Sequence, residues 1–213
     1  MLKDGYKFAA PPLALGAVAA ALGWRKAATA LLLAGSFVAY FFRDPDRIVP
    51  GDPGVVVSPA DGRVMEVASE RCADRAGNRV SIFLAIWDVH VNRSPMAGHL
   101  QRVEYRPGRF YAAMRSKASA ENEQNVIHLQ TDRGEIVFKQ IAGWVARRVV
   151  CWKSPGDSVL RGERIGLIRF GSRMDVWLPE AAEIVVKPGQ HVVGGVTVLA
   201  RWPSGSANEK ART

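Results

Sequence analysis

The sequence predicts a mainly β protein of the α+β class, in which an apolar helical hairpin precedes a β-rich, duplicated core. Three observations support this prediction. Two apolar stretches, residues 8–23 and 27–42, open the chain. Short β-rich runs punctuated by Gly, Pro and Asp follow from residue 48 onward. A pattern of turn and strand residues then occurs twice near the C-terminal end.

Composition limits the classes of partner. The 213 residues are 48% hydrophobic, enough for one sizeable domain with an appendage. A formal charge of +9 favours an acidic partner, either nucleic acid or an anionic membrane. The basic residues are scattered and not interleaved with aromatic ones, so we expect no nucleic-acid partner. Cys72 and Cys151 lie in no metal or redox spacing and predict reduced thiols of a cytoplasm-facing protein.

The apolar N-terminus predicts a membrane-associated helical hairpin over residues 1–46. Each stretch has 16 residues and would span about 24 Å as a helix, short of the roughly 30 Å of a bilayer core. Arg25 and Lys26 lie at the hairpin tip. Two true crossings would translocate these charges against the positive-inside tendency, so a hairpin within one leaflet is favoured. Two true spans and a buried hairpin of a soluble protein remain the alternatives.

Residues 47–203 are expected to form the β-rich domain, and 204–213 a flexible tail. Asp44-Pro45 ends the second helix, because the residue before a proline disfavours the helical conformation. Residues 111–122 are the best candidate for a helix or loop within the domain. Strands are predicted at 55–57, 63–67, 80–86, 126–129, 136–141, 145–152, 164–170, 175–178, 183–186 and 196–200.

The repeat pairs PGDSVLRGERIGLI (155–168) with PGQHVVGGVTVLAR (188–201). The two segments share Pro, Gly, Val and Gly at the same positions. This P-G-x-x-V-x-x-G unit of turn, strand and turn is typical of lipoyl- and biotinyl-type β-barrels. The Gly171-Ser172 pair lies in the connection between the two units, where well-ordered neighbours can support strained backbone chemistry.

Three polar stretches are candidates for chemistry: SPADGRV (58–64), WDVHVNRSP (87–95) and the Gly-Ser pair at 171–172. Taken singly, they read as a turn, a strand with a structural histidine and another turn. On a strand, Asp88, His90 and Asn92 would share one face. Together, Asp61, His90 and Ser172 could form a base-activated nucleophile.

The setting of that serine differs from those of known hydrolases. The G-x-S-x-G elbow of the serine hydrolases is absent. The histidine spacings match no metal motif, so no metal is expected. A glycine before a serine instead suits attack of the hydroxyl on its own preceding carbonyl. The resulting ester can eliminate to dehydroalanine, which hydrolyses to a pyruvoyl group on a new N-terminus.

Four motifs, in this order behind an apolar N-terminus, carry a resemblance to a known family: FFRDPDR (41–47), SPADGRV (58–64), DVHVNRSP (88–95) and FGSRMD (170–175). The chain resembles the phosphatidylserine decarboxylases, most closely their short bacterial and archaeal branch. The resemblance implies self-cleavage between Gly171 and Ser172 into a β chain (1–171) and an α chain (172–213), which stay associated. It also implies that the pyruvoyl group derived from Ser172 forms a Schiff base with the substrate amine and that no external cofactor is needed.

The resemblance further implies the substrate, the location and residue roles. The substrate would be phosphatidylserine in an anionic membrane, and the product phosphatidylethanolamine. The enzyme would be peripheral or monotopic on the cytoplasmic face of the inner cell membrane, with a homo-oligomer as one candidate assembly. Asp61 and His90 match catalytic positions. Long-chain members carry a second histidine, as the processing base, where this chain has Arg93, so either His90 serves both steps or another base acts. Arg93, Arg43 and Arg47 are candidate substrate contacts, with solvated surface as the alternative.

Two other functions are alternatives to this one. A membrane-anchored lipoyl-like binding or adaptor module would fit the duplicated unit, but it would normally carry a modifiable lysine in an E-x-M-K-M turn, which is absent. A cell-wall metallopeptidase would need H-x-H and H-x(3)-D pairs, which are also absent.

Overall fold

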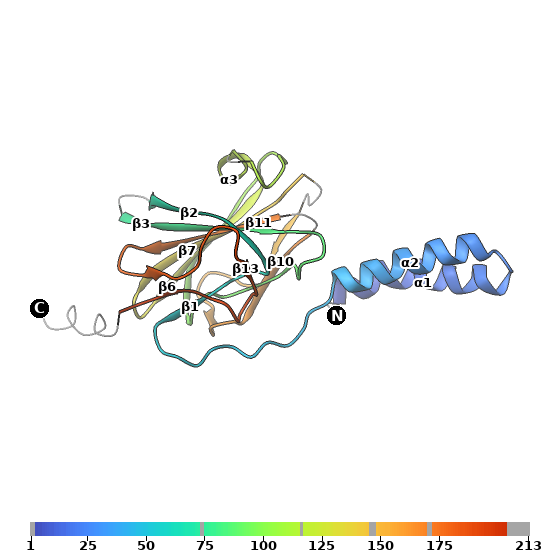
Figure 1. Ribbon diagram of the computed structural model, residues 1–213, viewed down its shortest axis with the longest axis horizontal. Helices are drawn as coiled ribbons and strands as arrows, with labels where there is room; N and C mark the ends of the chain where they lie inside the picture. Colours follow the sequence, from blue (N-terminus) through green and yellow to red (C-terminus); the bar gives the residue numbers. More distant parts are fainter. Residues whose placement is uncertain (1–2, 73–74, 116, 145–147, 170–171, 204–213) are drawn as a thin grey trace, which may run out of the picture. The chain divides into compact units, whose positions relative to one another are not determined.

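The computed structural model describes residues 3–72, 75–115, 117–144, 148–169 and 172–203 (Figure 1). The chain consists of two compact units, Met1–Asp46 and Arg47–Thr213. The first contains two helices, α1 (Lys3–Ala21) and α2 (Arg25–Phe41). The second contains the strands and one short helix, α3 (Ala118–Glu121).

Helices α1 and α2 form an antiparallel hairpin whose close packing depends on two glycines. A Cβ atom added at Gly16 would lie 2.9 Å from Leu32 Cγ, and one added at Gly35 would lie 2.6 Å from Leu13 Cγ. Both distances are shorter than van der Waals contact, so any larger residue would push the helices apart. The expected apolar helical hairpin is confirmed.

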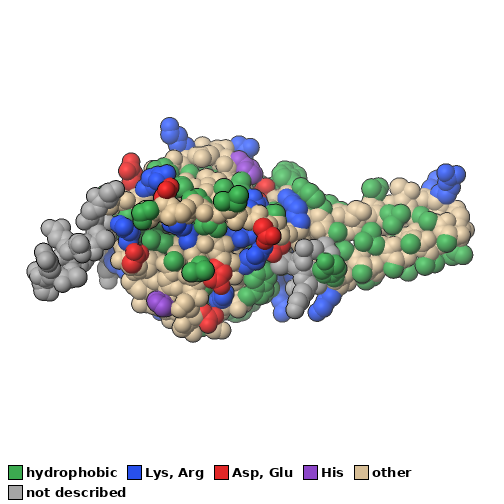
Figure 2. All heavy atoms as spheres, turned by 90° about the horizontal axis from the view of Figure 1, so that it is seen from below, with side chains coloured by type: hydrophobic (Ala, Val, Ile, Leu, Met, Phe, Trp, Pro, Cys, Tyr) green, Lys and Arg blue, Asp and Glu red, His purple; other side chains and the backbone are tan. Residues whose placement is uncertain are grey.

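The hairpin leaves much of its apolar surface uncovered. Figure 2 shows hydrophobic side chains distributed along the whole of its visible face, with cations at its tip. No helix in the described part of the chain combines the length and apolarity needed to cross a bilayer. The exposed large apolar side chains of this unit are Tyr6, Phe8, Leu15, Val18, Leu22, Trp24, Leu32, Leu33, Phe37 and Tyr40.

The second unit is built around one antiparallel sheet of eight strands in the order β13-β2-β3-β11-β7-β6-β5-β9. Two small sheets accompany it, β1-β14-β12 and β4-β10-β8. The strand bounds are β1 Val55–Val57, β2 Gly62–Cys72, β3 Arg75–Leu84, β4 Val91–Arg93, β5 Gly98–Arg106, β6 Gln124–Thr131, β7 Gly134–Ile141, β8 Val149–Cys151, β9 Ser158–Val159, β10 Arg164–Ile168, β11 Ser172–Pro179, β12 Glu183–Ile184, β13 His191–Val192 and β14 Val198–Arg201.

The core lies on one face of the large sheet, here called the inner face. Met174 and Val176 of β11 point into it, as alternation along a strand requires. Residues of all three sheets join the same cluster, among them Val56, Ile165 and Leu199. The predicted mainly β class is therefore confirmed, and the small sheets bury the inner face of the large one.

The two copies of the repeat have the same local structure. The valine that they share is buried in both copies, as Val159 and Val192. The four glycines that they share all adopt positive φ, a region that only glycine enters without strain. These angles are +93° at Gly156, +87° at Gly189, +76° at Gly162 and +76° at Gly195.

A second duplication, not recognised from the sequence, links the two Ser-Pro turns. The N–H of Val57 donates to the carbonyl of Pro95 at 2.9 Å, and the N–H of Arg93 donates to that of Pro59 at 2.8 Å. The turns thus exchange reciprocal hydrogen bonds as equivalent halves. Asp61 stands two residues after Pro59, where the other half has an alanine. The Ser-Pro pairs are therefore structural, whereas Asp61 breaks the symmetry.

Some expected elements differ in the structure. Strand β5 was not predicted, because a bulge between Leu100 and Arg102 interrupts its period-two pattern. The strand expected to align Asp88, His90 and Asn92 begins only at Val91, so that interpretation is wrong. Helix α3 falls within the candidate segment 111–122. Residues 145–147, 170–171 and the predicted tail 204–213 lie outside the described residues.

Candidate active site

Ser172 is the first residue of β11, in the middle of the large sheet (Figure 1). It lies opposite Leu84 of β3, and the next residue, Arg173, lies opposite Ile141 of β7. Its side chain is on the inner face, like that of Met174, and is fully buried. Its hydroxyl has no hydrogen-bond partner among the described residues. Because such a group costs about 1–3 kcal/mol when unsatisfied, it is a candidate for chemistry.

On the outer face of the large sheet, which is the face opposite the inner one, buried ionic contacts fix the start of β11. Arg173 Nε donates to Asp175 Oδ1 at 2.6 Å, and Arg173 Nη2 donates to Ser81 Oγ at 2.8 Å. Ser119, in α3, donates its hydroxyl to the other oxygen of Asp175 at 2.6 Å. This network was not predicted from the sequence, although Arg-x-Asp at period two directly after the serine is a signal for it. The contacts hold the residue after Ser172 in place.

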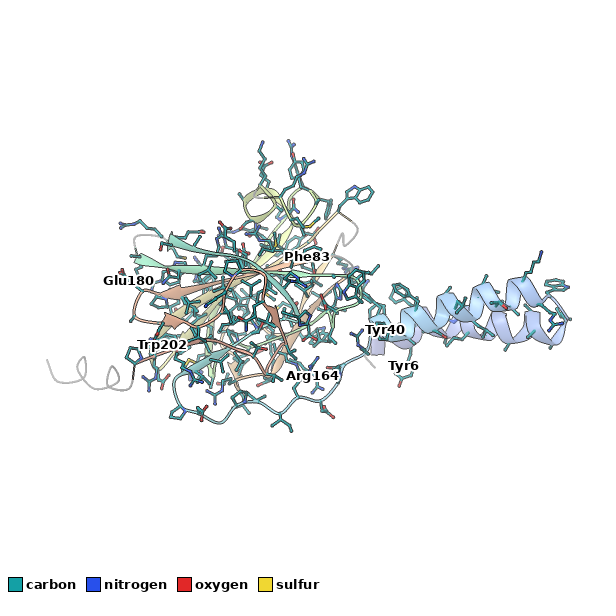
Figure 3. The ribbon with its side chains drawn as sticks, in the orientation of Figure 1. Tyr6, Tyr40, Phe83, Arg164, Glu180 and Trp202 are labelled. Atoms are coloured by element: carbon teal, nitrogen blue, oxygen red, sulfur yellow. The ribbon has the colours of Figure 1, made fainter. Side chains whose placement is uncertain are left out.

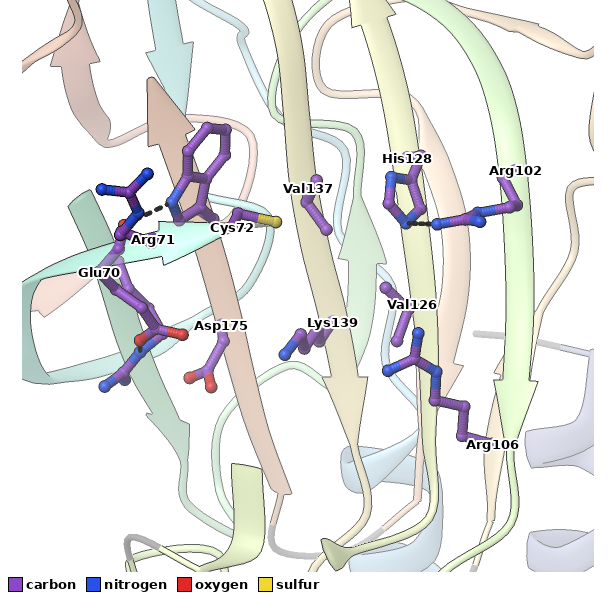
Figure 4. Close-up of a pocket in the computed structure, with 12 residues that line it drawn as sticks. Glu70, Arg71, Cys72, Arg102, Arg106, Val126, His128, Val137, Lys139 and Asp175 are labelled. Carbon is purple, nitrogen blue, oxygen red and sulfur yellow. Dashed lines mark hydrogen bonds and ion pairs between the residues drawn. The ribbon is translucent and has the colours of Figure 1, made fainter. Parts of the chain in front are cut away.

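A pocket of about 320 Å³ lies on that outer face (Figure 4). Asp175, Lys139 and Val126 line it from neighbouring strands, together with several arginines. Asp175 alternates with Met174 along β11, so the pocket and the Ser172 side chain are on opposite faces of the sheet. The pocket is therefore not the site of Ser172.

Asp61 lies in the turn before β2, and both of its carboxylate oxygens have partners. Oδ1 accepts a hydrogen bond from the N–H of Gly194 at 2.7 Å, and Oδ2 accepts one from Arg47 Nη2 at 2.8 Å. The pairing of β2 with β3 places Gly62 beside Leu84, whose other neighbour is Ser172. Asp61 and Ser172 thus flank the end of β3, with main chains about 10 Å apart at two strand spacings.

His90 is fully buried in the connection between β3 and β4. Its Nδ1 is 2.9 Å from the carbonyl oxygen of Asp88. A carbonyl only accepts, so this contact requires a proton on Nδ1 and leaves the lone pair of the neutral ring on Nε2. The main-chain carbonyl of His90 accepts from the N–H of Ile168 at 3.3 Å. Ile168 ends β10 four residues before Ser172, so His90 lies against the segment that leads to the serine.

The three predicted substrate-binding arginines have protein partners. Arg47 bonds to Asp61 as described. Arg93 is buried in β4 and donates to the carbonyl of Gly162 at 3.0 Å. Arg43 belongs to the helical unit, where its guanidinium carbon lies 3.8 Å from the ring centroid of Tyr40. Arg47 is thus in direct contact with another predicted site residue, Asp61.

The structure brings several of the predicted residues to one end of β3, and it does not describe the predicted cleavage site. Asp61, His90 and Ser172 all belong to segments that meet there. Gly171, the predicted cleavage site, lies outside the described residues. Within the described ranges, no cluster of His, Cys, Asp or Glu could hold a metal ion.

Comparison with known proteins identifies the family. The family model for phosphatidylserine decarboxylase matches residues 34–200. The chain belongs to the phosphatidylserine decarboxylase family. It is 50% identical over 192 residues to the phosphatidylserine decarboxylase proenzyme of Solibacter usitatus, covering 89% of this chain and 92% of that protein.

Further relatives carry the same name. The phosphatidylserine decarboxylase proenzyme of Symbiobacterium thermophilum is 46% identical over 207 residues, 94% of this chain and 95% of that protein. The proenzyme of Geotalea uraniireducens is 44% identical over 203 residues, 94% of this chain and 95% of that protein. Family membership confirms the resemblance and favours an enzyme over an adaptor module or a metallopeptidase.

Proposed function

We propose that this chain decarboxylates phosphatidylserine to phosphatidylethanolamine with a pyruvoyl group made from its own Ser172. The family supports the reaction, and the word proenzyme in the names of the relatives supports self-processing. The choice of residue depends on one observation, the buried Ser172 hydroxyl that has no partner among the described residues. That environment suits a group that reacts within the chain and not with water.

The processing step uses atoms of the chain alone until the last hydrolysis. The Ser172 hydroxyl oxygen attacks the carbonyl carbon of Gly171, the peptide C–N bond breaks and the nitrogen takes a proton. Loss of the serine α-proton then expels the Gly171 carboxylate and leaves dehydroalanine. Addition of water and loss of ammonia give the pyruvoyl group. Glycine on the acyl side offers the least steric resistance to the first attack.

Asp61 and His90 are the proposed proton carriers. Asp61 would assist processing from across the end of β3. His90 would first take up a proton on Nε2, which carries the lone pair of the neutral ring, and would then act as the acid that returns this proton to the substrate carbon after carbon dioxide leaves. Arg93 occupies the position of the second family histidine but cannot act as a base, because a guanidinium stays protonated.

A pyruvoyl group supplies a ketone that takes up the substrate amine and accepts the electron pair released by decarboxylation. After cleavage, the fold would hold in place the chain 172–213, which carries the pyruvoyl group. Strand β11 pairs with β3 along its whole length and with β7 over residues 173–177. We therefore propose that chains 1–171 and 172–213 stay associated, and that no external cofactor is required.

The helical unit would keep the site at the headgroup plane of an anionic membrane, on the cytoplasmic face of the inner membrane. Its exposed apolar side chains support insertion into one leaflet. The net charge of +9 favours the anionic substrate over the zwitterionic product. Arg43, Arg47 and Arg93 are candidate contacts of a lipid phosphate or carboxylate. In that role, each guanidinium would contact the lipid in addition to its present protein partner.

Intact-mass measurement combined with carbon dioxide release from phosphatidylserine tests the proposal. The wild-type protein should contain chains 1–171 and 172–213 and release carbon dioxide. Ser172→Ala should remain one chain of 213 residues and release none. Ser154→Ala, at an exposed serine, is the control and should behave as wild type. Cleavage of the Ser172→Ala protein, or a cleaved wild type without decarboxylase activity, would overturn the proposal.

A further inference from the structure

One edge of the large sheet gathers the strand ends around Ser172, and we call it the reactive edge. Strand β3 ends there at Leu84, β11 begins at Ser172 and β7 ends at Ile141, as the register of these strands requires. Strand β6 begins at the same edge, where Gln124 pairs with Ile141. The loops that follow these strand ends therefore surround the serine.

Two of these loops expose tryptophans. Trp87 follows the end of β3 by three residues and is 65% exposed. Trp144 follows the end of β7 by three residues and is 70% exposed. Three residues of extended chain span about 10 Å, so both side chains are within reach of the reactive edge. Tyr105, next to last in β5, is also exposed at this edge.

The opposite edge of the sheet has a different surface. Its described connections at 132–133 and 180–182 contain none of the exposed large apolar side chains, and Leu160, which follows β9 at this edge, is exposed but is not aromatic. Their exposed residues include Asp132 and Glu180. Figure 3 shows Glu180 at the far end of the sheet from Phe83, which precedes Leu84. The exposed aromatic residues are thus concentrated at the end where the proposed chemistry takes place.

Basic side chains accompany the tryptophans. The connection between β5 and β6 lies against residue 142, because Asn122 Nδ2 donates to the carbonyl of Ala142 at 2.7 Å. This connection exposes Met114, and Glu121 is an exposed acid in it. Among the described residues of the loops at this edge, the exposed cations outnumber that acid: they are Arg109, Arg115, Lys117 and Arg148.

We propose that the reactive edge is a membrane-docking surface in which Trp87 and Trp144 enter the headgroup layer of an anionic bilayer. Tryptophan prefers this layer because its ring is apolar and its N–H needs a polar partner. The neighbouring cations would contact lipid phosphates. The inference rests on the proposed function, since a lipid substrate must reach Ser172. It adds a second membrane contact, carried by the β unit itself.

Site-specific fluorophores on the full chain test the contact. In a Cys72→Ser, Cys151→Ser background, Trp87→Cys, Trp144→Cys and Trp152→Cys are each labelled with an environment-sensitive dye. Trp152 is the matched control, since it is a 43% exposed tryptophan just beyond the end of β8 at Cys151. Vesicles contain equal amounts of phosphatidylglycerol and phosphatidylcholine, with a spin-labelled lipid as quencher. Emission at 87 and 144 should shift to the blue and be quenched, while emission at 152 should not change.

Two results would overturn the inference. One is solvent-like emission at 87 and 144 in vesicle-bound protein. The other is shielding of both labels without vesicles that grows with protein concentration, which would mean that a second copy covers this edge.

Activity provides an independent measurement. The double variant Trp87→Ala, Trp144→Ala should lose about tenfold more activity on vesicles than on a dispersed short-chain phosphatidylserine, whereas Trp152→Ala should leave that ratio unchanged. Equal losses on both substrates contradict docking through this edge. Wild-type protein that releases no carbon dioxide would refute the proposed function instead, whatever the labels report.

Discussion

Arg47 donates a hydrogen bond to Asp61 at 2.8 Å, so two residues predicted from separate motifs form one ion pair. The other oxygen of Asp61 accepts from the N–H of Gly194 at 2.7 Å. These contacts hold the carboxylate beside the end of β3, on the side opposite to Ser172. Arg47 is therefore better placed to position the carboxylate of Asp61 than to bind a substrate by itself.

Asp61→Asn should accumulate uncut chain, because an amide still accepts from Gly194 but cannot take a proton. We expect cleavage to slow by about 100-fold or more, the usual size of a general-base contribution. Arg47→Ala should slow cleavage by a smaller factor, and Arg47→Lys should restore most of it. A time course of chain cleavage on gels measures all three. Wild-type cleavage by Asp61→Asn would exclude Asp61 from processing.

His90→Ala should reduce carbon dioxide release by about 100-fold or more, since the proposed proton donor is removed. Cleavage of the same protein, followed in parallel, decides whether His90 also serves processing. An uncut chain would mean that it does, and a cut but inactive chain would limit it to decarboxylation. Wild-type rates in both assays would remove this segment from the active site.

Arg93→His is the companion to that experiment, because the resemblance implies a second histidine at this position in the longer family members. We expect the variant to be tolerated and to cleave at least as fast as wild type. Arg93 donates to Gly162 and packs against Gly195, so Arg93→Ala serves as the control for lost packing. If both variants cleave equally slowly, the role of Arg93 in cleavage is the packing and hydrogen bonding of its side chain.

Removal of residues 1–40 should leave a folded β unit with reduced activity on vesicles. Every strand lies within Arg47–Thr213, and the hairpin packs through its own contacts at Gly16 and Gly35. Circular dichroism should show a β spectrum, and activity on short-chain phosphatidylserine should survive much better than activity on vesicles. Equal losses on the two substrates would show that the hairpin is part of the catalytic fold.

Cys72→Ser and Cys151→Ser should both keep activity within tenfold of wild type, because no thiol takes part in the proposed chemistry. Burial raises the pKa of the Cys151 thiol above its usual 9.0. Its reactive thiolate is therefore scarce at neutral pH and increases as the pH rises. Alkylation of Cys151 by iodoacetamide should be slower than that of free cysteine at pH 7 and should accelerate on unfolding. A larger loss of activity in a folded variant would assign a thiol to the site.

Several features could be predicted from the sequence because each depends only on residues that are close together along the chain. An apolar stretch of 16 residues is too long for a typical strand and predicts a helix, and α1 and α2 follow from the two such stretches. Glycine tolerates positive φ that other residues avoid, so the spacing of Gly156 and Gly162 marks the same turns as that of Gly189 and Gly195. The Gly-Ser pair is equally local, because the hydroxyl and the carbonyl that it would attack belong to adjacent residues.

Features that depend on strand register or burial required the tertiary structure. Strand β5 escaped prediction because a bulge shifts its alternation by one residue, and only pairing with β6 defines that shift. The Arg47–Asp61 pair and the Gly194 contact join positions 14 and 133 residues from Asp61. The position of Ser172 at the start of β11 follows from its pairing with Leu84 of β3 and from the pairing of the next residue, Arg173, with Ile141 of β7. Its own neighbours in sequence cannot specify these partners. The sequence alone thus determined the helical hairpin, the repeated turns and the Gly-Ser pair, whereas only the fold decided which distant groups surround that serine.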